Sequence, residues 1–151
     1  MRTAIAERQP PGGGIITSQP ELDLSAARRN AAIRQACLCA KIADEYRGRD
    51  TVVLDLTAVT PIFDFFVLST AGSPRQMRAI ADEVHRVLSA EGSKSLGTEG
   101  TESATWLLQD YGDIVLHVFT PAARSLYDLE HLWADAVPVD WQGYLDSSKT
   151  A

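Results

Sequence analysis

The stretch FDFFVLSTAGSPRQM, residues 63–77, decides the fold because it carries the chain from a strand directly into a helix. Its first half, Phe63–Thr70, is rich in aromatic and β-branched residues, the composition of a strand. Ser73 then offers a side-chain oxygen to the first helical N–H groups, and Pro74 suits the first helical position. Gln76, three residues after Ser73, completes a capping box. The stretch therefore predicts a strand that leads into a well-defined helix.

Apolar residues beyond this stretch recur with the spacing of one helix face until Gly92 ends the pattern. Upstream, an Ala-rich helix is expected over Ser25–Arg47, ending at Gly48. A short, nearly continuous apolar run at Thr51–Leu56 predicts a buried strand. The first half of the chain therefore reads helix, strand, strand, helix. The apolar helix positions after the cap are Met77, Ile80, Ala81, Val84, Val87 and Leu88.

The second half predicts three more strands and a last helix. A short strand is expected near Ser95–Glu99. A hairpin of Thr105–Asp110 and Asp113–Phe119 follows, joined by the two-residue loop Tyr111-Gly112. Thr120-Pro121 begins the last helix. The predicted fold class is α/β, with a mixed β-sheet flanked by helices. The side chains expected to point inward from the last helix are Leu126, Leu129, Leu132 and Trp133.

The two-residue loop predicts which hairpin residues face each other, with Trp106 opposite His117 and Asp110 opposite Asp113. Because side chains alternate between the faces of a strand, these four residues share one face with Leu108 and Val115. A face that mixes an aromatic ring, aliphatic side chains and carboxylates is typical of a protein interface. The alternative is that the last helix covers this face and packs the histidine into the core. The other face carries mostly core residues: Leu107, Gln109, Ile114, Leu116 and Val118.

The composition divides the chain into three parts. Residues 1–24 contain the break PPGGG at positions 10–14 and no apolar period, which predicts a disordered N-terminal extension. Residues 25–146 are expected to form one domain, and residues 147–151 a polar C-terminal tail. No apolar run approaches the ~20 residues that span a bilayer, so no membrane contact is expected.

Charge and cysteine content indicate the kind of partner and compartment. Residues 91–151 hold three basic and ten acidic residues, against eleven and ten in residues 1–90. An acidic half suits a basic protein partner and disfavours direct, sequence-specific binding of nucleic acid, whose phosphates attract Lys and Arg. Cys37 and Cys39 stand two apart on the expected helix, so they point to different sides. They are predicted to be reduced core residues, which favours a cytoplasmic location.

A search for catalytic chemistry finds no complete site. The passage from strand through Ala71-Gly72-Ser73 into a helix is similar to an anion-binding loop, but it lacks a glycine-rich phosphate motif and its serine serves as the cap. Nucleotidyl transfer on two metal ions needs spaced carboxylates on neighbouring strands, whereas Asp110 and Asp113 flank a turn. The three histidines lack metal-ligand spacing. The protein is therefore predicted not to be an enzyme, with no catalytic residue, metal or cofactor.

Several blocks of the sequence, in order, resemble one protein family. Asp64–Ser73, DFFVLSTAGS, resembles the Asp-Tyr-Phe-Val-Ile-x-Thr-Gly-x-Ser stretch of the Iojap-type ribosomal silencing factors. The resemblance covers about residues 28–135. The sequence departs from the family pattern at Phe65, at Ser73-Pro74 and in its N-terminal extension. Further matching blocks are Asp55-Leu56, Ala81–Val84, Leu96–Gly100, Trp106, Asp110–Phe119 and Tyr127–Trp133.

The resemblance implies a nucleotidyltransferase-like fold without catalytic carboxylates, and a function in ribosomal silencing. It implies binding to the large ribosomal subunit through ribosomal protein uL14 at the subunit interface, which blocks joining of the small subunit and represses translation. It also implies a homodimer in the free state. The partner-binding residues expected on these grounds are Trp106, Asp110, Tyr111, Asp113, His117, Tyr127 and Glu130.

Two other functions stay open at this point. One is a nucleotide-binding transferase of nucleotidyltransferase-like fold, which would bind nucleotide with Mg²⁺. The other is an adaptor for some other basic protein, which would not co-sediment with large ribosomal subunits.

Overall fold

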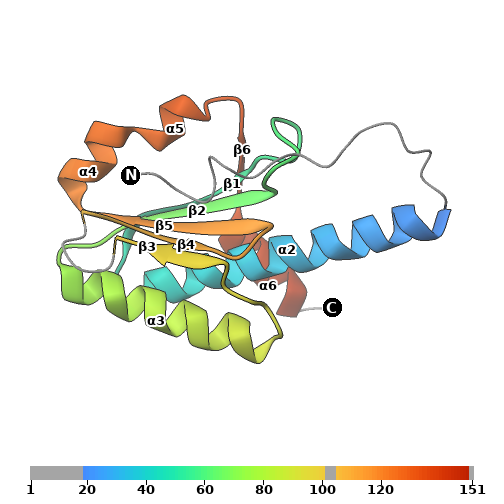
Figure 1. Cartoon of the computed structure of the whole chain (residues 1–151), viewed down its shortest axis with the longest axis horizontal. Helices are drawn as coiled ribbons and strands as arrows, with labels where there is room; N and C mark the ends of the chain where they lie inside the picture. Colours follow the sequence, from blue (N-terminus) through green and yellow to red (C-terminus); the bar gives the residue numbers. More distant parts are fainter. Residues whose placement is uncertain (1–18, 101–104, 150–151) are drawn as a thin grey trace.

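The computed structural model describes residues 19–100 and 105–149 (Figure 1). Its strands are β1 (Arg49–Asp55), β2 (Phe65–Thr70), β3 (Gly97–Glu99), β4 (Trp106–Asp110), β5 (Ile114–Phe119) and β6 (Val137–Val139). Its helices are α2 (Gln19–Glu45), α3 (Pro74–Ala90), α4 (Pro121–Tyr127), α5 (Leu129–Leu132) and α6 (Trp141–Lys149). Within the described part of the chain, no helix is both long and apolar enough to cross a membrane.

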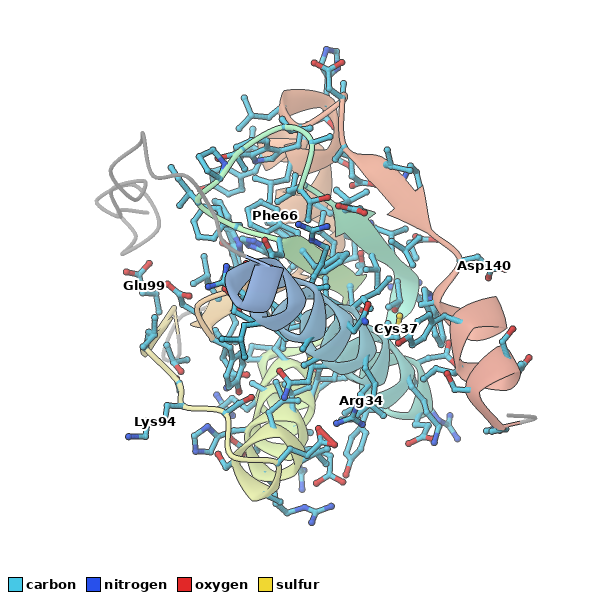
Figure 2. The ribbon with its side chains drawn as sticks, turned by 90° about the vertical axis from the view of Figure 1, so that its right-hand side faces the viewer. Arg34, Cys37, Phe66, Lys94, Glu99 and Asp140 are labelled. Atoms are coloured by element: carbon cyan, nitrogen blue, oxygen red, sulfur yellow. The ribbon has the colours of Figure 1, made fainter. Side chains whose placement is uncertain are left out.

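The strands form one mixed sheet in the order β3-β4-β5-β2-β1-β6. β2 runs parallel to β5 and antiparallel to β1, so the chain returns to the sheet centre after passing through α3, β3 and β4. Helices α2, α3 and α6 lie on one face of the sheet, and α4 and α5 lie on the other (Figure 1). Figure 2, turned by 90°, shows α3 and α6 on either side of α2. The predicted α/β class with a mixed sheet flanked by helices is confirmed.

The stretch from β2 into α3 has the predicted local structure. All six residues of β2 are buried, which places this strand in the centre of the sheet. The Ser73 hydroxyl accepts a hydrogen bond from the backbone N–H of Gln76 at 3.1 Å, and Pro74 is the first helical residue. Gln76 also donates its side-chain amide to the carbonyl of Tyr46, so the start of α3 is tied to the end of α2. The face of α3 that enters the core consists of Met77, Ile80, Ala81, Val84 and Leu88.

The hairpin register differs from the prediction by two residues. Trp106 pairs with Phe119 and Asp110 with Val115, and three residues rather than two, 111–113, connect β4 to β5. The backbone N–H of Tyr111 bonds to the carbonyl of Ile114 at 2.9 Å and closes this longer turn. A shift of two leaves every strand side chain on its predicted face, because side chains alternate with a period of two. The two faces were therefore predicted correctly although the pairings were wrong.

The boundaries at the two ends of the domain also differ from the prediction. Helix α2 begins at Gln19, six residues before the expected start, and residues 1–18 lie outside the described residues. The chain after α5 adds strand β6 beside β1 and then helix α6, which extends to Lys149 into the predicted polar tail. Neither element has a strong sequence pattern: β6 has three residues with Pro138 at its centre, and α6 has no fully buried side chain.

Candidate protein-docking site

Helices α4 and α5 cover the sheet face that carries Trp106 and His117. Beneath them lies a buried cluster that includes Phe66 from β2, Leu108 from β4 and Phe119 from β5. The helices contribute Ala123 and Leu129 to this cluster, and the half-buried Trp133 packs against it. The alternative interpretation is thus confirmed: the last helical segment covers this face, with Leu108, Val115 and His117 buried, and α4–α5 form the outer surface above it. The buried members are Leu54, Leu56, Phe63, Phe66, Leu68, Leu108, Val115, Phe119, Ala123, Leu129 and Ala136.

Trp106 joins the sheet to α4. Its ring is half-buried and lies 5.1 Å from the ring of Phe119 and 4.7 Å from that of Tyr127, measured between centroids. Its indole Nε1 donates a hydrogen bond to Nδ1 of His117 at 3.1 Å. Tyr127 remains 44 % exposed, so the aromatic stack leads from the core to the surface.

His117 is fully internal, with 1 % of its surface exposed. Burial lowers the pKa of the imidazole to about 3, because the charged form would lose its hydration. The ring is therefore neutral at pH 7. Since Nδ1 accepts from Trp106, the proton sits on Nε2, which has no hydrogen-bond partner among the described residues. His117 supports the aromatic stack from below and has no exposed atom to offer a partner directly.

Leu126 and Leu132 correct the prediction for the last helix, because they point outward with 77 % and 72 % of their surface exposed. The predicted single helix is broken at Asp128, whose φ of 44° lies in the left-handed region. This residue ends α4 and begins α5, and it turns the positions that follow away from the stripe expected of one continuous helix. Leu129 is buried as predicted, whereas its two leucine neighbours in the stripe are not.

These residues define the docking surface, which we take as the exposed side chains Leu126, Tyr127 and Leu132 with Trp106 beneath Tyr127. Monomeric proteins expose single leucines routinely, but several large apolar side chains on one short segment are typical of an interaction site. The surface also has an acidic border, since the exposed residues on or directly beside α4–α5 include Asp128, Glu130 and Asp135. The arrangement fits a partner that is both apolar and basic.

The remaining predicted site residues lie at the other end of the hairpin. Asp110 is buried and its carboxylate accepts a hydrogen bond from the backbone N–H of Gly112 at 2.9 Å, which stabilises the turn. Tyr111 donates its hydroxyl to the side chain of Gln109, and burial raises the pKa of this phenol. Asp113 is half-buried and lies 3.6 Å from Arg28 of α2.

The seven predicted residues thus fall into two groups. Trp106, His117 and Tyr127 meet in one stack, and Glu130 stands on the neighbouring helix α5, where it pairs with Arg124. The other three form the turn between β4 and β5, at the far end of a five-residue strand from Trp106. A strand rises about 3.4 Å per residue, so the groups are about 14 Å apart along β4. The sequence analysis placed Leu126 and Leu132 in the core, and no sequence pattern marked the left-handed residue Asp128 that separates α4 from α5.

The described residues include no group of three or more His, Cys, Asp or Glu side chains placed to hold a metal ion. Cys37 and Cys39 are buried and free, as predicted for core thiols. Burial raises the pKa of Cys37 to about 11, and it also raises the pKa of Cys39, so both remain protonated at neutral pH. Asp55 accepts hydrogen bonds from the backbone and hydroxyl of Thr57 and closes the end of β1.

The fold and this surface define a class: a mixed-sheet α/β protein with exposed aromatic and aliphatic side chains on two short helices. The model of the protein family described as "Ribosomal silencing factor during starvation" matches residues 29–151 of this chain. The chain therefore belongs to the ribosomal silencing factor family, and the family resemblance seen in the sequence is confirmed.

Individual relatives agree with this assignment. The chain is similar to a ribosomal silencing factor from Chromobacterium violaceum, with 38% identity over 101 residues, 67% of this chain and 83% of the relative. A crystal structure of a Chromobacterium violaceum protein superposes with a TM-score of 0.62 at 38% identity, covering 64% of this chain and 81% of that one. A more distant relative from Mus musculus, 28% identical over 57% of this chain and 39% of its own length, is named "Mitochondrial assembly of ribosomal large subunit protein 1".

Proposed function

We propose that this protein binds the large ribosomal subunit through ribosomal protein uL14 at the subunit interface, blocks joining of the small subunit and so represses translation. It acts by occupying a surface and is not an enzyme. Membership of the ribosomal silencing factor family supports the ribosome as its target, and the name of the mouse relative supports the large subunit. A ribosomal target also supports a cytoplasmic location, which is part of the proposal.

The observation that carries the proposal is the exposed apolar surface on α4–α5. Burial of each exposed side chain by a partner would stabilise the complex, by about 1.5–3 kcal/mol for a large side chain that becomes fully buried. The side chains concerned are Leu126, Tyr127 and Leu132. A partner that covers these side chains is therefore stabilised on the surface, and the domain need not change its fold to bind. The aromatic stack of Tyr127 on Trp106 gives such a contact a rigid base.

The charge of the region fits a ribosomal protein better than ribosomal RNA. Asp128, Glu130 and Asp135 would repel phosphate and attract the Lys and Arg side chains of a basic protein. The turn residues Tyr111 and Asp113 belong to the proposed contact set as a second, separate area on the same hairpin. Asp110 and His117 contribute by holding the turn and the aromatic stack in place.

The test is co-sedimentation of the purified protein with large ribosomal subunits in a sucrose gradient. The double variant Leu126→Ser/Leu132→Ser removes exposed apolar surface and should leave the thermal midpoint unchanged, because neither side chain is in the core. Its affinity should fall at least tenfold, the loss expected for about 1.4 kcal/mol or more of buried apolar contact.

The matched control is Leu24→Ser, which changes a leucine that is 71 % exposed on α2. It should bind as the wild type does. Equal binding by the double variant and the wild type would refute α4–α5 as the contact. Failure of the wild type to co-sediment, or to inhibit joining of the small subunit, would refute the function.

The homodimer implied for the free protein is part of this proposal. A second copy would cover exposed apolar side chains when no ribosome is present. Sedimentation equilibrium at several concentrations tests it, and a monomer mass throughout would rule it out.

A further inference from the structure

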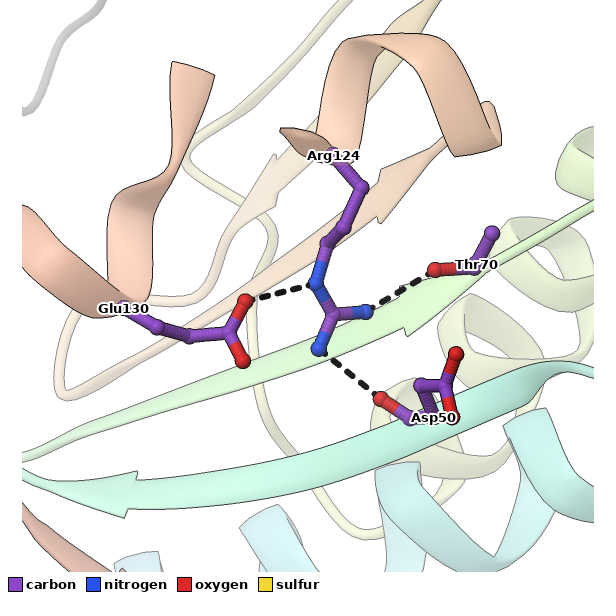
Figure 3. A network of polar contacts seen from close by, with 4 residues as sticks. All are labelled: Asp50, Thr70, Arg124 and Glu130. Atoms are coloured by element: carbon purple, nitrogen blue, oxygen red, sulfur yellow. Dashed lines mark hydrogen bonds and ion pairs between the residues drawn. The ribbon is translucent and has the colours of Figure 1, made fainter. Parts of the chain in front are cut away.

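Arg124 on α4 links three elements that are far apart in the sequence (Figure 3). Its Nε donates to the carboxylate of Glu130 on α5 at 2.7 Å, and its Nη1 donates to the hydroxyl of Thr70 on β2 at 3.0 Å. Its Nη2 donates to the backbone carbonyl of Asp50 on β1 at 2.9 Å. The partners on β1 and β2 lie 74 and 54 residues away along the chain. We call this set of contacts the Arg124 clasp.

Arg124 is more enclosed than the basic side chains of the other ion pairs among the described residues, although its partner Glu130 is 42% exposed. The Arg124 side chain is 12% exposed, whereas the basic side chains in the pairs Arg34–Glu91 and Arg86–Glu83 are 48% and 70% exposed. Exposed ion pairs contribute little to stability, because water screens the charges. A guanidinium that is largely withdrawn from water depends on its acceptors much more strongly.

The clasp stabilises a segment whose helices are too short to be stable on their own. Helices α4 and α5 have seven and four residues, and isolated helices shorter than about 12–15 residues are marginal in water. The apolar anchors of the segment on the sheet are Ala123, Leu129 and the half-buried Trp133. Tyr127 adds its contact with the ring of Trp106 on β4, whereas Leu126 and Leu132 point the other way and contribute little to this attachment.

The forked arrangement of N–H donors on the Arg124 guanidinium is required at this site. One planar guanidinium directs three donors at three acceptors on α5, β2 and β1, which the single ammonium of a lysine cannot reproduce. Leu126 and Tyr127 stand between the two charged members of the clasp, Arg124 and Glu130, in the sequence. Fixing both ends of this short stretch therefore fixes the direction in which Leu126 and Tyr127 project.

We propose that Arg124 is a positioning residue for the docking surface: its clasp with Glu130, Thr70 and Asp50 holds α4–α5 in the conformation that a partner recognises. The inference rests on the proposed function for the identity of that partner. A preformed surface binds more tightly because no ordering cost is incurred on association. If only a tenth of the molecules keep the competent conformation, the apparent affinity falls tenfold.

The experiment compares Arg124→Lys, which keeps the charge but loses the fork, with Thr70→Val, which removes one acceptor at nearly constant volume. Hydrogen exchange of the free protein should speed up within residues 121–133 and stay unchanged in α3 and β5. Affinity for large ribosomal subunits should fall about tenfold for the lysine variant. Arg34→Lys makes the same change at an arginine outside the clasp, in the more exposed pair with Glu91, so it should behave as the wild type.

A second control separates positioning from loss of stability. Ser73→Ala removes the cap of α3, lowers the thermal midpoint of the whole domain and should leave affinity unchanged. The clasp proposal is wrong if Arg124→Lys leaves exchange in residues 121–133 unchanged, or if that exchange rises while affinity stays at the wild-type value. Because hydrogen exchange is measured on the free protein, it tests whether the clasp orders residues 121–133 even if the wild type fails to bind large subunits. That failure would refute the proposed function alone.

Discussion

At the level of single residues, the chain keeps a titratable ring inside its core. His117 lies among Phe66, Phe119 and Trp106, with ring centroids 4.6 to 6.1 Å away. Only Nδ1 has a partner among the described residues, and Nε2 carries a proton without an acceptor. A neutral imidazole can remain in such a place, whereas an imidazolium would be a buried charge with no counter-ion. The aromatic stack beneath the docking surface is therefore sensitive to pH.

The stability of the protein should fall as the pH falls below about 6.5. The pKa of His117 is about 3 in the folded protein and 6.5 in its model environment, so in this range only the unfolded state takes up the proton. The stabilisation is complete well above pH 6.5 and is lost as the pH drops toward 3. Between pH 8 and pH 5, the loss should be about 2 kcal/mol. Urea titrations at a series of pH values measure it.

His117→Gln provides the comparison, because its side-chain oxygen can still accept from Trp106 but the side chain does not titrate. The free energy of unfolding of this variant should change less over the same range, by about the same 2 kcal/mol. Parallel pH profiles for the two proteins would show that His117 is not responsible.

At the level of elements, the end of α2 is fixed by close contact with β2. Gly48 follows the helix, and its backbone N–H bonds to the carbonyl of Ala43 at 2.7 Å. A Cβ at this position would overlap the hydroxyl oxygen of Ser69 and lie 2.8 Å from the carbonyl oxygen of Ala43. Ser69 is itself hydrogen-bonded to Thr51, so it cannot move away freely. Only glycine fits at position 48, because there is no room for a Cβ.

Gly48→Ala should lower the free energy of unfolding by about 1–3 kcal/mol, the range expected for overpacking in a close-packed region. Removing the Ser69 hydroxyl in the double variant Gly48→Ala/Ser69→Ala should recover part of this loss. Thermal and urea denaturation of the two single variants and the double variant give the coupling energy. A coupling of zero would mean that contact with Ser69 does not explain the glycine.

At the level of the whole molecule, charge is divided between the two halves of the sequence. The acidic residues of the second half include those at the border of the docking surface, while most basic residues belong to the first half. Exposed acidic residues on and beside α4–α5 would attract a basic partner to this part of the molecule. In the proposed function, this charge would favour a basic ribosomal protein over ribosomal RNA as the component that is recognised.

We expect isolated ribosomal protein uL14 to bind the purified protein without ribosomal RNA. Binding should weaken as salt is raised from 50 to 500 mM, because screening weakens attraction between exposed charges. Surface plasmon resonance with uL14 alone measures both effects. The reversal Asp135→Lys should slow association at low salt, whereas Asp82→Lys, on the exposed side of α3, should not. A requirement for RNA in this assay would contradict recognition through protein.

The sequence alone determined the features that depend on near neighbours. The cap at Ser73, the apolar stripe of α3 and the two faces of the hairpin all follow from residues within one or two turns or from the alternation of a strand. The faces survived an error of two in the register because the alternation has a period of two. The blocks that identify the family were also visible in the residues themselves.

Tertiary structure decided the features that depend on distant residues. No local pattern shows that Arg124 reaches Thr70 and Asp50, since these residues meet only when α4 lies on the sheet. The same packing decides that Leu129 is buried while Leu126 and Leu132 are exposed, because the break at Asp128 lets each short helix take its own orientation. Apolar periodicity predicts which residues prefer to leave water, but only the packed sheet determines which of them find room in the core. The leucines left outside are the ones proposed to bind the partner.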